Sequence, residues 1–267
     1  MKVDVFDLNG KSSGKIDLPG VFSEKIREDL IKRAVLSTQS KHRQPYGTDP
    51  YAGFRSSAGY HGYRRHRYTM MNREMARMPR LHGKTSPQLN MRPRVVPQSV
   101  KGRVAHPPLV EKIFEQKIND KERRKAVRSA IAATAVKDLV EKRGHRFSLQ
   151  ELPIVVDDGF QNLKKSKEVI EFFRKVGLEG ELERISQKKV RVGKGKGRGR
   201  KYKKKIGPLV VISENKGIMN AVKNLQGVNV CRAQNLSAEF LAPGAMPGRL
   251  TIFTKSALES LKKMHGE

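Results

Sequence analysis

An internal stretch of 74 residues, 37–110, limits what this chain can fold into more than any other part of the sequence. It contains fourteen Pro and Gly residues, spread along its whole length, and no isoleucine. Proline removes a backbone donor from helices and sheets, and glycine raises the entropic cost of ordering either one. Too few aliphatic side chains remain to offset the cost of ordering so long a segment. We therefore expect it to take its order from a partner.

The charge of this segment indicates that the partner is an anion. Fourteen Lys and Arg residues stand against two acids, Asp49 and Glu74, and we call residues 37–110 the long basic segment. The short basic run, residues 188–205, adds eleven Lys and Arg and no acid. Together the two account for +23 of the formal net charge of +30, which leaves +7 on the other 175 residues. This asymmetry separates a scaffold of ordinary charge from two binding segments.

The arginine and tyrosine residues of the long basic segment indicate that its anionic partner is RNA. Eleven of the fourteen basic residues in the long basic segment are Arg, and five of the six tyrosines of the chain lie there with Phe54. Arg binds phosphate through two donors and stacks on bases, and aromatic rings stack on splayed bases. A disordered basic tail is the plain alternative, but this segment is internal and rich in aromatics. The predicted RNA-binding residues are Lys41, Arg43, Arg55, Arg64, Arg65, Arg67, Arg73, Arg77, Arg80, Lys84, Arg92, Arg94, Lys101, Arg103, Lys194, Lys196, Arg198, Arg200, Lys201 and Lys203.

Outside the two basic segments, strand-like and helix-like patterns alternate. Apolar or alternating runs predict strands at 2–8, 15–18, 152–156, 208–213, 228–232 and 249–254. Helical spacing predicts a first helix capped by Ser23, a long helix at 121–143 capped by Asp120, and further helices at 166–176, 180–187, 218–225 and 256–264. Strands separated by single helices favour an α/β fold, with a mostly parallel sheet and helices on its faces.

The sequence indicates neither a membrane protein nor a secreted protein. No apolar window approaches ~20 residues, the length of a membrane span, and the N-terminus lacks the apolar core of a signal peptide. Cys231 is the single cysteine, so an internal disulfide is excluded and a reducing compartment is favoured. Because it lies in an apolar run, we expect its thiol to be buried. We expect a cytoplasmic protein.

An enzyme is not expected either. Residues 10–12 and 83–85 resemble the end of a phosphate-binding loop, but Val5 and Met78 stand where its first glycine is required. Asp157-Asp158 could hold a divalent ion, but this pair is more typical of a polar turn after a strand. The histidines at 42, 61, 66, 82 and 106 lack the context of a zinc site. No metal or cofactor is therefore predicted. An RNA-acting enzyme with an unrecognised site on the α/β domain is the alternative.

Six stretches give the sequence a specific resemblance to a known family. They are DLPGVFSEKIREDLIKRAV (17–35), Ala76-Arg77-Met78-Pro79-Arg80, VKGRVAHPP (100–108), AVRSAIAATA (126–135), GKGKGRGRKY (193–202) and LAPGAMPGRLTIFT (241–254). Over essentially its full length the chain resembles the archaeal and eukaryotic branch of the uL-four family of large-subunit ribosomal proteins.

The resemblance implies a Rossmann-like α/β domain over residues 1–36 and 111–267, with the short basic run as an RNA-binding loop. It implies that residues 37–110 form an extended loop that penetrates ribosomal RNA and helps to line the nascent-peptide exit tunnel. The implied partners are large-subunit ribosomal RNA, neighbouring ribosomal proteins and the nascent polypeptide. Mapped onto this sequence, the basic stretch of the family's loop makes Met71, Arg73 and Met75 the candidates for the tunnel wall.

Overall fold

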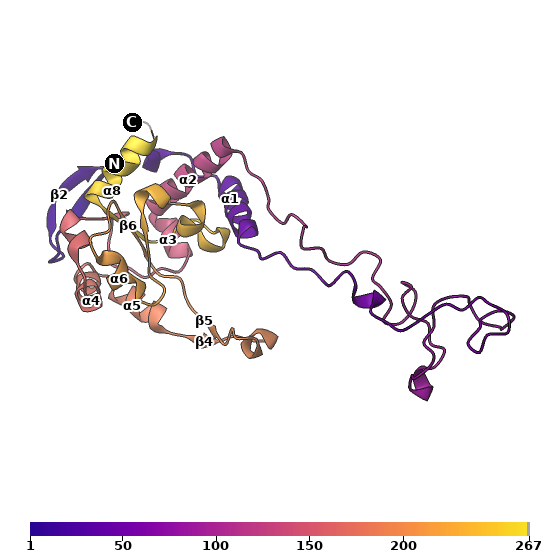
Figure 1. Ribbon diagram of the computed structural model, residues 1–267. Helices are drawn as coiled ribbons and strands as arrows, with labels where there is room; N and C mark the ends of the chain where they lie inside the picture. Colours follow the sequence, from indigo (N-terminus) through magenta and orange to yellow (C-terminus); the bar gives the residue numbers. More distant parts are fainter. Residues whose placement is uncertain (266–267) are drawn as a thin grey trace. The chain divides into compact units, whose positions relative to one another are not determined.

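A six-stranded β-sheet is the centre of the computed structural model, which describes residues 1–265 (Figure 1). The chain divides into two compact units. The first unit consists of Met1–Lys41 and the chain from Gln116 onwards, and it contains the sheet. The second unit is His42–Glu115.

The sheet has the strand order β2-β1-β3-β8-β6-β7. Its strands are β1 (Lys2–Phe6), β2 (Ser12–Asp17), β3 (Ile154–Val156), β6 (Leu209–Ile212), β7 (Asn229–Arg232) and β8 (Thr251–Thr254). Only the edge strand β2 runs antiparallel to its neighbour, because a tight turn joins it to β1. In that turn Gly10 has a φ of 76° and donates a hydrogen bond to the carbonyl of Asp7, a conformation that glycine adopts without strain.

Alternate residues of the central strands point into two separate cores. Val155 of β3 and Phe253 of β8 belong to one core, whereas Ile154 and Ile252 belong to the other. Both faces are apolar because parallel strands are covered on both sides, and side chains along a strand alternate with a period of two. The continuous apolar runs of the sequence therefore supply both cores at once.

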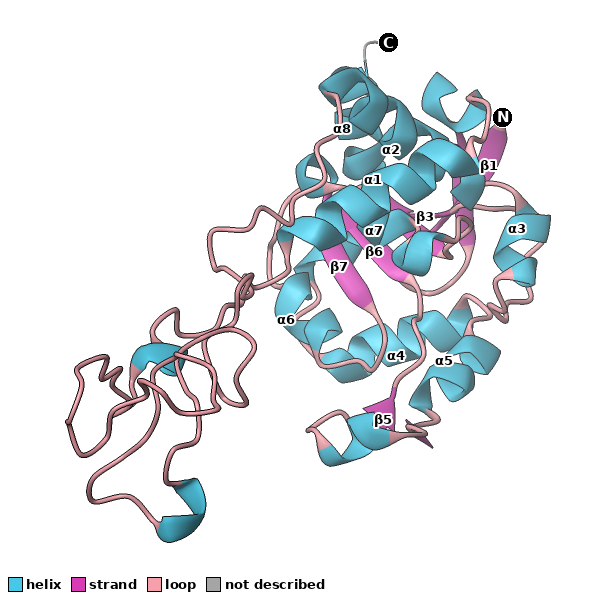
Figure 2. Cartoon of the chain, turned by 90° about the vertical axis from the view of Figure 1, so that its right-hand side faces the viewer, coloured by secondary structure: helices cyan, strands magenta, loops and turns pink. Residues whose placement is uncertain are grey.

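Two groups of helices cover the two faces of the sheet (Figure 2). The first core is completed by α1 (Glu28–Lys41), α2 (Asp120–Thr134), α7 (Ala238–Leu241) and α8 (Lys255–His265). The second core is completed by α3 (Lys137–Lys142), α4 (Ser166–Lys175), α5 (Glu179–Ser186) and α6 (Ile218–Lys223). The predicted class is thus confirmed: an α/β fold with a mostly parallel sheet and flanking helices. Among residues 1–265, no helix is both long and apolar enough to cross a membrane.

The single helix predicted over 121–143 is wrong, because the chain breaks it into α2 and α3. The backbone tightens where the amide of Ala135 bonds to the carbonyl of Ala132, and Val136 is extended, with φ −90° and ψ 109°. The break lets Ala130 pack in the first core and Val140 in the second. Asp120 is the first residue of α2 rather than its cap, and Asn119 precedes it.

The start and the end of the first predicted helix also differ from the structure. Ser23 lies in a 3₁₀ turn, η1 (Gly20–Ser23), and α1 begins only at Glu28. This turn places Val21 and Phe22 in the first core, where Phe22 meets Phe253 edge-on. At its other end α1 continues through residues 37–41, which the sequence had assigned to the long basic segment.

The second unit has very little regular structure of its own. Its named elements are two 3₁₀ turns, η2 (Ala52–Phe54) and η3 (Pro87–Leu89). Isolated bridges pair Arg80 with Gly59 on one side and with Pro93 on the other. Met70 and Leu81 are the buried apolar side chains found in this unit. Two such residues do not make a core, so backbone bonds and polar contacts carry most of its order.

Candidate nucleic-acid interface

The short basic run folds into a small hairpin in the first unit. Its strands are β4 (Lys189–Val190) and β5 (Tyr202–Lys203), which pair antiparallel, and a 3₁₀ turn, η5 (Lys194–Gly197), lies between them. All six of the predicted RNA-binding residues in this run are exposed: Lys194, Lys196, Arg198, Arg200, Lys201 and Lys203. Like charges crowd together here without acidic residues between them, so the hairpin is a concentrated positive surface.

Side chains from the body of the first unit bind the chain where it leaves the hairpin. Arg184 of α5 donates to the carbonyl of Ile206 at 2.6 Å, and Arg249 donates to the carbonyl of Gly207 at 2.9 Å. The amide of Gly207 in turn bonds to the carbonyl of Gly227. These bonds hold the base of the hairpin on rigid elements, while its basic tip stays exposed.

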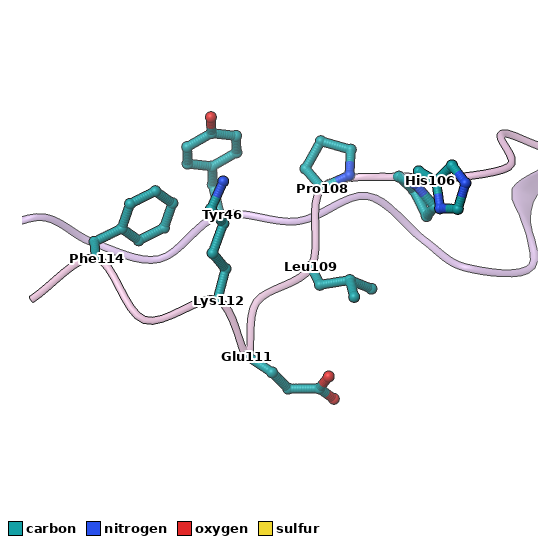
Figure 3. Close-up of a pocket in the computed structure, with 8 residues that line it drawn as sticks. Tyr46, His106, Pro108, Leu109, Glu111, Lys112 and Phe114 are labelled. Atoms are coloured by element: carbon teal, nitrogen blue, oxygen red, sulfur yellow. The ribbon is translucent and has the colours of Figure 1, made fainter.

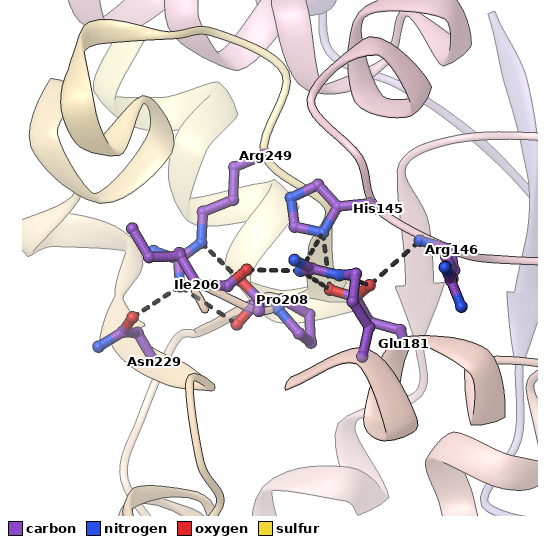
Figure 4. Close-up of polar contacts among 9 residues, drawn as sticks. His145, Arg146, Glu181, Ile206, Pro208, Asn229 and Arg249 are labelled. Carbon is purple, nitrogen blue, oxygen red and sulfur yellow. Dashed lines mark hydrogen bonds and ion pairs between the residues drawn. The ribbon is translucent and has the colours of Figure 1, made fainter. Parts of the chain in front are cut away.

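A buried cluster of polar side chains lies behind these anchors (Figure 4). Nδ1 of His145 is 2.7 Å from Oε1 of Glu181, and both side chains are buried. Arg184 donates to both carboxylate oxygens of Glu181 at 2.7 Å, and the amide of Arg146 adds a further bond. A buried carboxylate is thereby fully hydrogen-bonded, the condition under which burying such a charge is tolerated.

The two titratable groups of this cluster have lowered pKa values for different reasons. Burial opposes ionisation of Glu181, but hydrogen bonds from Arg184 and His145 lower its pKa to about 2. Burial lowers the pKa of His145 below its ordinary value, although Glu181 acts in the opposite direction. The geometry supports a neutral imidazole, because Nε2 of His145 is buried without a hydrogen-bond partner among the described residues. Nδ1 then carries the proton that binds Glu181.

Arg249 is the second buried centre of this region, and its side chain is 1% exposed. Its guanidinium donates to the carbonyls of Gly207 and Phe240 and to the side-chain oxygen of Asn229. Burial and the neighbouring Arg143 lower the pKa of Arg249 to about 9, so it still carries its charge at neutral pH. It therefore joins three segments that are far apart in the sequence.

In the second unit, the predicted RNA-binding residues are mostly exposed. Arg80, Arg94 and Arg103 are half-buried. The exposed residues in residues 42–115 are Arg43, Arg55, Arg64, Arg65, Arg67, Arg73, Arg77, Lys84, Arg92 and Lys101. Lys41, the remaining predicted residue, is exposed at the end of α1 in the first unit. Of the tunnel-wall candidates, Arg73 is exposed, and Met71 and Met75 are half-buried.

Arg80 organises the second unit from within. Its guanidinium donates to the carbonyl of Met91 at 2.8 Å and to the carbonyl of Ala76 at 3.0 Å. Its backbone exchanges hydrogen bonds with Gly59. Much of the donor capacity of Arg80 is thus used inside the protein, in contrast to the exposed arginines around it.

Aromatic rings gather where the two ends of the second unit run alongside each other (Figure 3). Tyr46 and Phe114 are stacked with ring centroids 5.7 Å apart, and the guanidinium of Arg43 lies 4.7 Å above the Phe114 ring. The Tyr46 and Phe114 side chains, with Pro108 and Lys112, line an open cavity of about 520 Å³. The Tyr46 ring is 60% exposed, so a face suited to stacking stands beside two cationic side chains.

A second aromatic cluster contains three of the histidines. Nε2 of His61 is 2.6 Å from Nε2 of His82, and the His61 ring also stacks on His66. Tyr68 stacks on His82, and Arg67 lies over the Tyr68 ring. Burial and the two neighbouring histidines lower the pKa of His61. The described residues contain no group of three or more His, Cys, Asp or Glu that could hold a metal ion.

Non-glycine residues with positive φ, the left-handed region of backbone conformation, are concentrated in the second unit. Of the six non-glycine residues described with positive φ, five lie here: Arg65, Asn72, Met91, Val95 and Lys101. Val95, at φ 73°, is a branched residue in a conformation that such residues rarely adopt. Strain of this kind persists only where other contacts impose it, and it concentrates at ligand-binding segments.

At the carboxyl edge of the sheet, the two acids after β3 are used within the protein. Asp157 forms an ion pair with Lys255 at 2.9 Å, and this contact lowers the pKa of Asp157. Asp158 accepts hydrogen bonds from the amide and the hydroxyl of Ser256, at 3.0 and 2.6 Å, at the start of α8. These carboxylates thus fasten the start of α8 to the end of β3.

Sequence reasoning missed the residues that hold the interface in place. His145, Glu181, Arg184 and Arg249 carried no motif, since they come together only through folding. Arg249 did give one signal, a lone charge at the start of an apolar strand-like run. A charge in such a position is typical of a residue with buried partners.

Comparison with known proteins places this geometry in context. A family model described as ribosomal protein L4/L1 family matches residues 16–264. The large ribosomal subunit protein uL4 of Methanopyrus kandleri is 46% identical over 269 residues, covering all of both chains. The protein of the same name from Methanocaldococcus jannaschii is 46% identical over 98% of this chain and 99% of its own. That of Haloarcula marismortui is 43% identical over 97% and 98%.

Proposed function

The chain belongs to the ribosomal protein L4/L1 family, and we propose that it binds large-subunit ribosomal RNA through its two basic segments. The observation that carries this proposal is the exposure of sixteen of the nineteen predicted RNA-binding residues that lie within residues 42–115 and 188–205. Electrostatic attraction to phosphate makes exposed Lys and Arg the main source of affinity for nucleic acid.

RNA is also the partner that accounts for the state of the second unit. Its few buried apolar groups cannot offset the entropy of ordering 74 residues, and its backbone is strained at five non-glycine positions. Contacts with phosphates and bases supply the missing free energy when the RNA is present. This unit would then be ordered by the subunit that it helps to assemble.

We further propose that the second unit forms a loop that penetrates the RNA and lines the nascent-peptide exit tunnel, with Met71, Arg73 and Met75 at its wall. Family membership and the exposed Arg73 support this placement. Large side chains at this position would narrow the passage for an emerging polypeptide. The protein would thus act as a structural part of the subunit rather than as an enzyme.

The test is a chain that lacks residues 60–77, introduced in place of the full-length protein. We expect the truncated chain to sediment with large subunits, because the short basic run and the flanking arginines keep most phosphate contacts. A structure of these subunits should show a wider tunnel, and peptides that stall translation should stall less. If the truncated chain no longer enters the subunit, residues 60–77 are an assembly element and the tunnel assignment fails.

Co-sedimentation of the full-length chain tests the broader proposal. A matched variant with Gln at all six basic positions from Lys194 to Lys203 should sediment less completely as salt is raised. Absence of the full-length chain from large subunits, or cleavage of RNA by the purified chain, would favour an RNA-acting enzyme.

A further inference from the structure

A groove on the second core's side of the first unit has a different character from the two basic segments. It lies between α4 and α5, with the end of α6 at its edge, and α4 neighbours both of the other helices (Figure 2). Its volume is about 500 Å³, within the range of binding sites for small ligands and short peptide segments. Ile170, Leu182 and Leu225 supply partly buried apolar surface to it.

The helices around this groove lack the large excess of basic residues found in the rest of the chain. Residues 166–186 contain five acids and four basic residues, whereas the whole chain has a net charge of +30. The charged residues that line the groove are Glu179, Glu183 and Arg174. Glu179 has only a long contact of 3.9 Å with Arg174, and no ion-pair partner is found for Glu183 within residues 1–265. The carboxylates of Glu179 and Glu183 would attract a cationic group.

The helix that carries these acids is held rigidly from behind. Glu181, Arg184 and Ile185 lie on the inner side of α5, where the first two join the cluster around His145 and the third is buried in the second core. Residues three and four positions apart share a face of a helix, so Glu179, Leu182 and Glu183 are presented together on the outer side. A groove that is formed before binding loses little conformational entropy when it is filled.

We propose that this groove docks a basic segment of a partner protein, in which Lys or Arg flanks one or two large apolar side chains. The apolar side chains would pack against Ile170, Leu182 and Leu225, and the cationic groups would pair with Glu179 and Glu183. The groove would therefore bind protein, whereas the two basic segments would bind RNA. It goes beyond the proposed function, since RNA binding by those segments does not require it.

Photocrosslinking of the full-length, tagged chain in intact cells tests this proposal. Benzoylphenylalanine replaces Gln226, an exposed residue of the groove, or Lys223, an exposed residue of α6 that does not line it. After irradiation the chain is purified by its tag, and crosslinked peptides and nucleotides are identified by mass spectrometry. From Gln226 we expect a protein segment with Lys or Arg within a few residues of the crosslinked apolar residue, and from Lys223 no such product.

Charge reversal supplies the matched comparison. Glu183→Lys should lower the crosslink yield from Gln226 at least about fivefold, the effect of losing roughly 1 kcal/mol from an ion pair. Glu171→Lys should leave the yield unchanged, because this exposed acid on α4 does not line the groove. Both substitutions are on the surface, and equal unfolding temperatures would confirm that both variants fold.

Several outcomes would overturn the proposal. They are a crosslink from Gln226 to RNA, a crosslink to a second copy of this chain, a yield no higher than at Lys223, or equal yields for the two charge reversals. The fraction of the chain that sediments with large subunits is measured on the same cells. If the chain did not sediment with large subunits, the proposed function would be refuted, but the crosslinks would still test the docking of a partner protein.

Discussion

Nε of Arg249 lies 2.9 Å from the carbonyl oxygen of Gly207, so a residue just before β8 holds the point where the short basic run rejoins the sheet. This contact links the most buried arginine of the protein to the base of one of its most exposed segments. This hydrogen bond therefore connects the buried core to the hairpin that we propose binds RNA.

Replacement of this arginine should be costly. Arg249→Met removes four hydrogen bonds, two of them to the buried carbonyl oxygens of residues 207 and 208, so we expect a loss of about 2–4 kcal/mol in the free energy of unfolding. Urea unfolding of the purified protein measures it. Arg232→Met, at an exposed position of β7, is the matched control and should change stability by less than ~0.5 kcal/mol. Equal stability of the two variants would contradict the role assigned to Arg249.

The buried pair of His145 and Glu181 predicts that the protein loses stability in acid. The folded-state pKa of His145 is lowered, so the unfolded chain binds the proton first, and stability falls as pH decreases below about 6.5. Glu181, with a pKa of about 2, adds a second loss as pH falls from its ordinary value of 4.5 towards 2. Stability measured from pH 7.5 to 5.5 should decline more steeply in the natural protein than in His145→Gln, which keeps a donor for Glu181. Parallel curves would show that His145 does not titrate with unfolding.

Amide exchange should differ sharply between the two units. In RNA-free protein we expect fast exchange over most of residues 42–115, because Met70 and Leu81 alone are described as buried apolar groups there. Residues 154–156 and 209–212, in the centre of the sheet, should be the slowest to exchange. Hydrogen exchange followed by mass spectrometry resolves these peptides. Strong protection throughout residues 42–115 without RNA would show that this unit is stable alone.

RNA affinity should depend steeply on salt, and the short basic run should contribute a measurable share. Each phosphate contact adds about 0.7–0.9 to the slope of log affinity against log salt concentration. Replacing all six predicted residues from Lys194 to Lys203 with Gln should therefore lower the slope by up to about 5, and replacing three of them by about half as much. Filter binding at several salt concentrations gives the slopes. A slope unchanged by six substitutions would show that the hairpin does not contact phosphate.

Much of the architecture could be predicted because it depends on local patterns. The apolar runs at 152–156 and 208–213 contain the strands β3 and β6 of the sheet, and the two segments with excess charge could be found by counting residues. The boundaries were less accurate: α1 continues to Lys41 and α2 ends at Thr134. Contacts with other elements, rather than helix propensity, decide where these helices end.

For the basic residues too, the sequence predicted the kind of ligand, whereas the structure distinguishes the roles of individual residues. Composition alone indicated RNA as the ligand, and the exposure of Arg73 and Arg200 agrees with that prediction without testing it. The structure separates Arg80, whose donors bind carbonyls of its own unit, from its exposed neighbours. No property of the sequence around Arg80 distinguishes it from Arg77, because hydrogen-bond partners are set by the path of the whole segment.

The class of fold, the two basic segments and the family follow from the amino-acid sequence, since periodicity, charge and motif similarity are all local or additive properties. The strand order, the break at Val136, and the cluster that joins His145 to Glu181 across 36 residues depend on the folded chain. A buried polar group is stable only when distant segments bring it partners. Such partnerships depend on the packing of the whole sheet and its helices, which no short stretch of residues specifies.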